Sequence, residues 1–122
     1  MKALLLVAHG SRRQRSNDEV IELAQKLKSE CVDHYDIVQA AFLELADTLI
    51  ADGIENCVNA GASHITVLPY FLNSGRHVTE DIPHDVDNTR SKFPNVQIHI
   101  AQHIGESPAM IPLLKAAAVN NS

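Results

Sequence analysis

Hydrophobic and polar positions alternate along the chain in a pattern that predicts successive β-strand and α-helix units. Residues 2–8 form a short, nearly continuous apolar run, which is typical of a buried parallel strand. A helix is expected to follow from Ser16, with Glu19 three residues on as a capping box. Its apolar face is expected at helical spacing, through Val20, Leu23, Ala24, Leu27 and Cys31.

The second unit begins with a strand expected over residues 35–43. Asp47 is the expected cap of the next helix, and Gly61 is expected to end it, as a C-terminal glycine commonly does. Gly53 lies inside this helix, where glycine costs about 1 kcal/mol relative to alanine. The expected apolar face consists of Ile50, Ile54, Cys57 and Val58.

The third strand is expected over residues 63–68, where Pro69 closes it, and residues 70–80 are expected to form a long loop. The next helix is expected from about Asp81, with Pro83 in its first turn, where the missing N–H does no harm.

The fourth strand is expected over residues 96–101, and the last helix is expected to open at Ser107 and Pro108 and to run to Val119. Pro112 is expected to delay or kink the start of that helix. Four strand–helix units predict an α/β fold: an open parallel four-stranded sheet with helices on both faces.

The composition limits the class of protein. A length of 122 residues, 45% of them hydrophobic, predicts one domain over residues 1–122. No apolar run is long enough to span a bilayer or to serve as a signal peptide, so we expect a cytoplasmic protein without a membrane partner. The formal net charge of −5 disfavours nucleic acid as a partner. Cys31 and Cys57 fit no metal-binding spacing and are expected to be small buried hydrophobes in a reducing compartment.

Candidate chemistry gathers where the strands end. His9, Glu44, His77 and His103 each follow one of the four expected strands, and the carboxyl ends of parallel strands meet at one edge of a sheet. Imidazole suits transition metals and, when neutral, also accepts protons. Each residue also has an ordinary structural explanation, and only their convergence favours a site. Asp81 is expected to be a helix cap rather than a ligand.

Arginines are concentrated in two of the same loops. Arg12, Arg13 and Arg15 crowd the loop after the first strand, and Arg76 lies in the loop after the third. Arginine is favoured where a planar fork grips carboxylate or phosphate, although a solvated basic surface explains the pattern equally well. Glycine-rich phosphate loops, dinucleotide-binding fingerprints and the hydrolase nucleophile elbow are all absent from the sequence.

Three segments resemble a known family. VAHGSR (residues 7–12), AFLELA (residues 41–46) and PYFLNSGRHVTEDIP (residues 69–83) closely resemble the small class II tetrapyrrole chelatases of the CbiX type, the sirohydrochlorin metal chelatases. The order and spacing of the segments match, and the similarity covers essentially the whole chain. The chain departs from the family pattern at Thr48, where many relatives have proline, and at His103, where a small residue or proline is usual.

The resemblance implies a flavodoxin-like chelatase half, that is, one lobe of a class II chelatase. It implies ATP-independent insertion of a divalent metal into sirohydrochlorin for cobalamin or siroheme biosynthesis, with Co²⁺ as the first choice and Fe²⁺ or Ni²⁺ as alternatives. The metal is then a substrate, and no prosthetic group is implied. The metal-handling histidines of the family fall on His9 and His77, and its acidic residue falls on Glu44. A homodimer that imitates the two lobes of longer chelatases is expected.

Insertion requires that the macrocycle be held, that a metal be presented and that two pyrrole protons leave. Residues expected to hold the substrate carboxylates are Ser11, Arg12 and Arg13 in one loop and Ser74, Gly75 and Arg76 in the other. His9 and His77 are expected to hold the metal loosely, and either histidine or Glu44 can accept the protons.

Three other functions use the same residues. A metal or tetrapyrrole carrier needs the same residues as a chelatase, and only turnover separates the two. A histidine phosphatase would use His9 as phosphoryl acceptor, but that class needs an arginine directly before the His-Gly pair, where this chain has Ala8. A degenerate structural subunit is disfavoured because His9, Glu44 and His77 are all intact.

Overall fold

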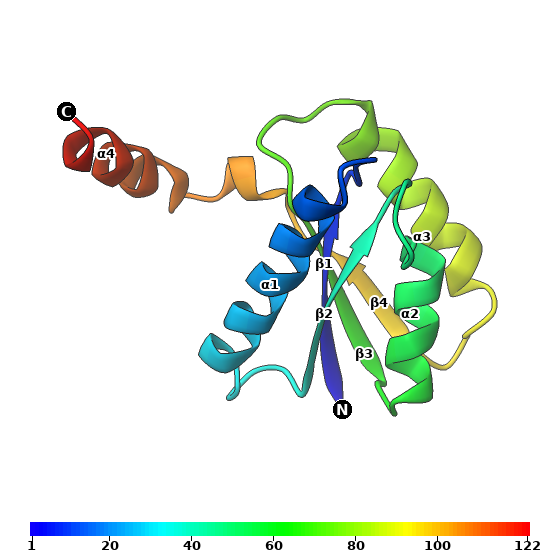
Figure 1. The fold of residues 1–122 in the computed structure, drawn as a ribbon. Coiled ribbons are helices and arrows are strands. Elements are labelled where there is room, and N and C mark those ends of the chain that lie inside the picture. The colour runs from blue at the N-terminus through cyan, green and yellow to red at the C-terminus, as the bar shows by residue number, and fades with distance from the viewer.

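A parallel four-stranded sheet in the order β2-β1-β3-β4 forms the centre of the molecule (Figure 1). The computed structural model describes residues 1–122. The strands are β1 (Lys2–Ala8), β2 (Ile37–Phe42), β3 (His64–Pro69) and β4 (Gln97–Ile100). The helices are α1 (Gln14–Glu30), α2 (Ile50–Asn59), α3 (Ile82–Arg90) and α4 (Met110–Asn120), with a π-helical turn η1 (His77–Asp81) and a 3-10 turn η2 (Ile104–Glu106). The predicted α/β class with a parallel four-stranded sheet is confirmed.

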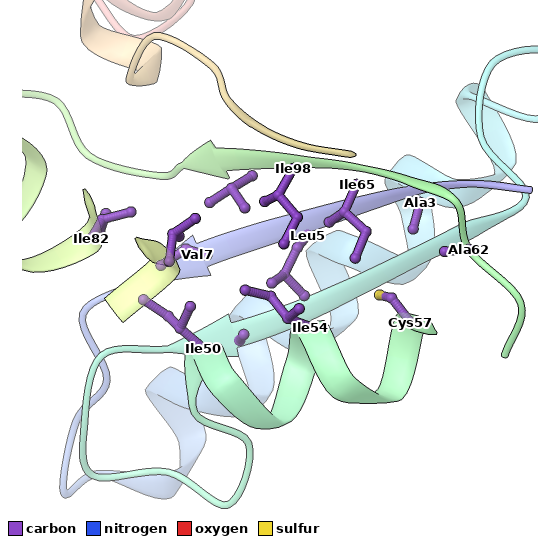
Figure 2. Close-up of a cluster of buried hydrophobic side chains, with 13 residues drawn as sticks. Ala3, Leu5, Val7, Ile50, Ile54, Cys57, Ala62, Ile65, Ile82 and Ile98 are labelled. Atoms are coloured by element: carbon purple, nitrogen blue, oxygen red, sulfur yellow. The ribbon is translucent and has the colours of Figure 1, made fainter. Parts of the chain in front are cut away.

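The main core lies between the sheet and the helices α2 and α3 (Figure 2). Alternate residues of a strand point to one face, so Ala3, Leu5 and Val7 of β1 meet Ile50 and Ile54 of α2. Each fully buried aliphatic side chain of this kind contributes about 1.5–3 kcal/mol relative to an exposed one. Further members of the core are Ala41, Cys57, Ala62, Ile65, Val67, Ile82, Val86 and Ile98.

Gly53 explains how closely α2 approaches the sheet. A Cβ atom at this position would lie 2.9 Å from a methyl group of Leu5 and 3.0 Å from the Cβ of Ala41. The glycine that weakens the predicted helix therefore allows α2 to pack directly on β1 and β2. Burial also raises the pKa of the Cys57 thiol to about 11, because the thiolate would lose its hydration.

The opposite face of the sheet is only partly covered. Helix α1 packs against β2, and Leu4 and Leu6 of β1 are buried on this side. Helices therefore lie on both faces, as predicted, but α4 extends away from the sheet and buries none of its residues (Figure 1). No helix is long and apolar enough to cross a membrane.

Two predicted helix starts are wrong. Helix α1 begins at Gln14 rather than Ser16, and no side chain caps it. Helix α2 begins at Ile50, and the carboxylate of Asp52, not Asp47, accepts a hydrogen bond from the Leu49 N–H at 3.0 Å. Leu49 is extended and forms an isolated bridge with Phe42, so the helix can begin only after it, beyond Asp47.

Other expectations fail at the edges of elements. In the middle of α1, Ala24 of the predicted stripe is buried as expected, but Leu23 is exposed, and Asn17, which the stripe did not include, is buried. The helical path before α3 begins at His77 as a π-turn, so the last residues of the predicted 70–80 loop are helical. Helix α4 begins at Met110, and Ser107 precedes it and accepts a hydrogen bond from the Ala109 N–H at 3.1 Å.

Candidate functional site

Two histidine rings meet at the carboxyl edge of the sheet. His9 follows β1 and His77 begins the π-turn after β3, and these two strands are neighbours. The ring centroids lie 4.5 Å apart with an interplanar angle of 58°. Both side chains are a little less than half exposed, so a ligand can reach them from solvent. The structure thus brings together the two histidines that the sequence placed on one edge.

Glu44 joins this pair from the loop after β2. Its Oε1 lies 4.0 Å from Nε2 of His9, and its backbone N–H donates to the carbonyl of His9 at 3.2 Å. Gly10 makes the approach of the two loops feasible. Its φ of +93° is a left-handed conformation that favours glycine, and a Cβ there would come within 1.7 Å of the Glu44 carbonyl oxygen. Gly10 therefore fixes the spacing of His9 and Glu44.

Both histidines have an acceptor next to Nδ1. The His9 Nδ1 lies 2.9 Å from the Gly10 carbonyl oxygen, and the His77 Nδ1 lies 2.7 Å from Oδ2 of Asp81. A carbonyl or a carboxylate can only accept a hydrogen bond, so each contact places a proton on Nδ1. In the neutral ring, Nε2 then carries the free lone pair, which is the form that binds a metal.

The prediction that Asp81 caps a helix is wrong. The backbone of Asp81 is itself helical and its side chain makes no capping bond, because the π-turn continues directly into α3. The Ile82 N–H already donates to the His77 carbonyl, five residues back. The Asp81 carboxylate is therefore free to hold the His77 ring.

Asn17 is a positioning residue that the sequence analysis missed. It is buried in the first part of α1, and its side-chain Oδ1 accepts from the Ser11 N–H at 2.9 Å. Its Nδ2 donates to the carbonyls of Ser11 and Leu45, at 2.9 Å and 3.0 Å. One amide thus joins the loop that carries His9 to the loop that carries Glu44. The available signal was an asparagine on the same helical face as Val20 and Ala24.

The predicted substrate-holding residues lie in the two loops that also carry His9 and His77. Arg12 and Arg13 are exposed, and the Ser11 Oγ accepts from the Arg13 N–H at 3.0 Å. Arg76 is exposed and its Nε lies 3.2 Å from Oε2 of Glu80, an ion pair so open to solvent that it is weak. Ser74 and Gly75 are exposed beside it. The three guanidinium groups are therefore accessible to an anion.

His103 does not lie at the surface of this edge. It is buried, and its Nδ1 lies 3.9 Å from Oε1 of Glu106 in η2. No group of three or more His, Cys, Asp or Glu side chains is arranged to enclose a metal ion. Five cavities elsewhere on the chain are lined by other residues and include none of His9, Glu44 and His77. The site is an open face with two imidazoles and one nearby carboxylate.

Comparison with known proteins gives a consistent result. The model of the CbiX family matches residues 3–120. The chain is 34% identical over 104 residues to the sirohydrochlorin ferrochelatase of Bacillus subtilis (strain 168), a match that covers 85% of this chain and 39% of that protein. It is 33% identical over 118 residues to the sirohydrochlorin cobaltochelatase of Sulfolobus acidocaldarius, which covers 97% of this chain and 90% of that protein.

A solved structure described as SirB from Bacillus subtilis with Fe³⁺ superposes with a TM-score of 0.85 and 30% identity, covering 94% of this chain and 45% of that chain. The prediction of one lobe of a class II chelatase is therefore confirmed at the level of the fold. The chain spans only 39–56% of the length of four of the curated relatives it matches.

Proposed function

This chain belongs to the CbiX family, and from that membership we propose that it inserts a divalent metal ion into sirohydrochlorin without ATP. The observation that carries the proposal is the pair His9 and His77, whose rings are 4.5 Å apart and whose Nδ1 atoms both have acceptors. The relatives that are named sirohydrochlorin ferrochelatases and cobaltochelatases supply the substrate class.

The metal is a substrate that must be released, and an open two-histidine site suits that task. A closed set of four protein ligands would trap the ion, whereas few ligands and exchangeable water permit transfer to four pyrrole nitrogens. The Nε2 atoms of His9 and His77 are the proposed ligands. Such nitrogen ligands bind Co²⁺ and Ni²⁺ more tightly than Fe²⁺ whatever metal the protein uses, so the two ligands do not identify the physiological metal. Among these ions, we propose Co²⁺ as the first choice.

Two pyrrole protons must leave as the divalent ion enters the macrocycle, so the charge of the product is unchanged by the exchange. A histidine nitrogen that holds the metal has no lone pair left for a proton. Glu44 is therefore the proposed proton acceptor, and its exposed carboxylate lies 4.0 Å from Nε2 of His9. From there, protons can pass to solvent.

The carboxylates on the rim of sirohydrochlorin require local positive charge on a chain whose net charge is −5. Arg12, Arg13 and Arg76 are proposed to supply it, since all three are exposed and belong to the loops that carry His9 and His77. Ser11, Ser74 and Gly75 are proposed to add hydroxyl and backbone contacts. A local basic rim of this kind allows an acidic protein to bind a polyanion.

A second copy of the chain is proposed to cover the other side of the macrocycle. The chain spans about half the length of most matched relatives, and both side chains of its histidine pair are open to solvent. A homodimer would close that face with a second lobe.

Turnover under anaerobic conditions tests this function. Purified protein is mixed with sirohydrochlorin and Co²⁺, Fe²⁺ or Ni²⁺, and the visible spectrum is followed against the rate without protein. We expect multiple turnovers, and a loss of at least ~100-fold in His9→Ala and His77→Ala. His84→Ala is the matched control, because His84 is an exposed histidine on α3 that contacts Asn88. A spectral change that stops at one equivalent would instead indicate a carrier, and unaffected histidine variants would refute the site.

A further inference from the structure

Leu45, the residue directly after Glu44, has a strained backbone. Its φ is +57°, in the left-handed region, and no other residue except glycine has a positive φ in this chain. The Cβ of an L-residue crowds the following carbonyl oxygen in this conformation. Glycine avoids that contact, and asparagine or aspartate offsets it with a local hydrogen bond, but leucine can do neither. The conformation of Leu45 therefore depends on support from its surroundings.

The residues around Leu45 hold its backbone on both sides. The Glu44 N–H donates to the His9 carbonyl at 3.2 Å, and the Glu44 carbonyl oxygen lies where a Cβ on Gly10 would approach it to 1.7 Å. The Leu45 carbonyl accepts from Nδ2 of the buried Asn17 at 3.0 Å. Strained residues that are fixed by their neighbours in this way cluster at active sites and ligand clamps.

Neither the loop nor the core accounts for a leucine at this position. Glycine adopts left-handed φ values freely, so it would carry Glu44 in the same loop without strain. The hydrophobic core does not require the side chain either, because Leu45 is 46% exposed. The strain therefore maintains an exposed apolar side chain next to the carboxylate that we place as the proton acceptor. This arrangement indicates a use for the side chain outside the folded chain itself.

A second exposed leucine lies on the other side of His9. Leu72 is 61% exposed and belongs to the loop after β3. Because β1 lies between β2 and β3, the loops that carry Leu45 and Leu72 flank the loop that carries His9 (Figure 1). The turn η2 fixes the backbone there: the Gly105 N–H donates to the Phe71 carbonyl at 3.1 Å, and a Cβ on Gly105 would lie 1.7 Å from the Leu72 carbonyl oxygen.

We propose that Leu45 and Leu72 contact one apolar face of the sirohydrochlorin ring on either side of the histidine pair, and that Leu45 is a main determinant of tetrapyrrole affinity. This inference rests on the metal insertion proposed above. The ring has broad apolar faces inside its rim of carboxylates, and an ion presented by two histidines must enter through such a face. The leucines exclude water from that face, while the arginines bind the rim. The fixed backbone of Leu45 reduces the ordering that binding requires.

Binding of metal-free sirohydrochlorin, measured by anaerobic absorbance titration, is the first test. Asparagine tolerates left-handed φ values, so Leu45→Asn should keep a urea midpoint close to that of the wild type. Its Kd for sirohydrochlorin should rise about tenfold, because the exposed half of the leucine side chain no longer leaves water on binding. Leu45→Met keeps the apolar volume and should stay within about twofold of the wild-type Kd.

Val32→Asn is the matched control for the loss of an exposed apolar side chain. Val32 is 67% exposed and precedes β2, whereas Leu45 follows the same strand at its other end. We expect the Kd of Val32→Asn for sirohydrochlorin to equal that of the wild type. A rise as large as that of Leu45→Asn would show that the effect is not local to the site and would overturn the proposal.

Two further measurements separate contact with the ring from support of the metal ligands. Calorimetric titration with Co²⁺, without tetrapyrrole, should give the same affinity for Leu45→Asn and the wild type, because Leu45 does not hold the ion. The loss of sirohydrochlorin affinity in Leu45→Asn should also persist between ~0.1 M and ~1 M salt, since the contact is apolar. The loss caused by Arg76→Gln should shrink over the same range, because salt screens exposed charges.

The outcomes distinguish this inference from the proposed function. A folded Leu45→Asn that binds sirohydrochlorin as tightly as a wild type that turns over would overturn the contact and leave the chelatase intact. A Co²⁺ affinity that falls in the same variant would also overturn it, because Leu45 would then act by positioning the loops of His9 and Glu44. A wild type that neither binds nor metallates sirohydrochlorin would refute the proposed function, and the contact with it.

Discussion

The carboxylate of Asp81 should control how well His77 binds the metal, although Asp81 is not itself placed as a ligand. Its Oδ2 accepts the Nδ1 proton of His77 at 2.7 Å, which leaves Nε2 of that ring free for the ion. Removing the carboxylate in Asp81→Ala allows the proton to move to Nε2 and the ring to rotate. Either change removes the lone pair from the position in which the metal is held.

The size of the effect follows from the exposure of the pair. A buried hydrogen bond to a charged group contributes about 1.5–3 kcal/mol. The side chains of His77 and Asp81 are both more than two-fifths exposed, so we take about 1.4 kcal/mol as the upper limit for the contribution of their hydrogen bond. That free energy corresponds to roughly a tenfold change in metal affinity, the lower end of the ~10–100-fold range seen when a carboxylate behind a metal-bound histidine is removed. Asp81→Asn keeps an acceptor oxygen and should lose less than Asp81→Ala.

Calorimetric titration with Co²⁺ and the steady-state insertion rate are the assays. We expect metal affinity and kcat/KM to fall in the order wild type, Asp81→Asn, Asp81→Ala, with His77→Ala lowest. Asp87→Asn is the control, since Asp87 is an exposed aspartate on the same helix that pairs with Arg90. If Asp81→Ala binds Co²⁺ within twofold of wild type while His77→Ala does not bind, the orienting role of the carboxylate is refuted.

The remaining predictions concern the supports of the site and the core. Gly10→Ala should lower the free energy of unfolding by at least ~2 kcal/mol and reduce activity, because the new Cβ would collide with the Glu44 carbonyl oxygen and the backbone has a left-handed φ. Gly75→Ala is the control, since the space around Gly75 is open. Its free energy of unfolding, measured by the same urea titration, should change by less than ~0.5 kcal/mol. Asn17→Ala removes three hydrogen bonds of about 1 kcal/mol each, so the free energy of unfolding measured in urea should fall by ~2–3 kcal/mol. An unchanged free energy of unfolding would show that the loops carrying His9 and Glu44 stay together without Asn17. Burial raises the pKa of the Cys57 thiol from 9.0 to about 11, so the thiol loses its proton at a lower pH in the unfolded chain than in the folded one. The free energy of unfolding should therefore fall by up to ~2–3 kcal/mol as the pH rises from 9 to 11. Cys57→Ala should show a correspondingly weaker pH dependence, and an unchanged slope would exclude the thiol as its source.

The strands and the position of the histidine pair could be predicted from the sequence because both depend on short-range pattern. The apolar run of β1 and the polar residue that ends it are sufficient to place His9 at the carboxyl edge. A neighbouring parallel strand, β3, then brings His77 to the same edge. These inferences need only the alternation of elements and the geometry of parallel sheets.

The roles of Asp81 and Asn17 could not be predicted because they depend on where other backbone groups find partners. Asp81 follows a long predicted loop, which is the usual position of a helix cap. In the structure, the π-turn that begins at His77 provides the hydrogen bond from the Ile82 N–H to the His77 carbonyl, so this N–H needs no side-chain cap. Asn17 interrupts an apolar helix face, yet its partners lie in loops 6 and 28 residues away. The partial packing of α4 was equally invisible, since an apolar helix pattern predicts burial without saying in which chain.

The π-turn has a consequence for how this site could be lost. The π-turn fixes the rotation about the helix axis at which His77 stands relative to α3, with the Asp81 carboxylate beside its ring. Deleting one of the three residues between them would let the segment close as an ordinary α-helix that still joins α3 without a break. The helix would survive while His77 rotated by about 100° relative to α3, away from the position where its ring meets that of His9. A single codon deletion, rather than any substitution of a ligand, is therefore enough to produce a folded, inactive paralogue.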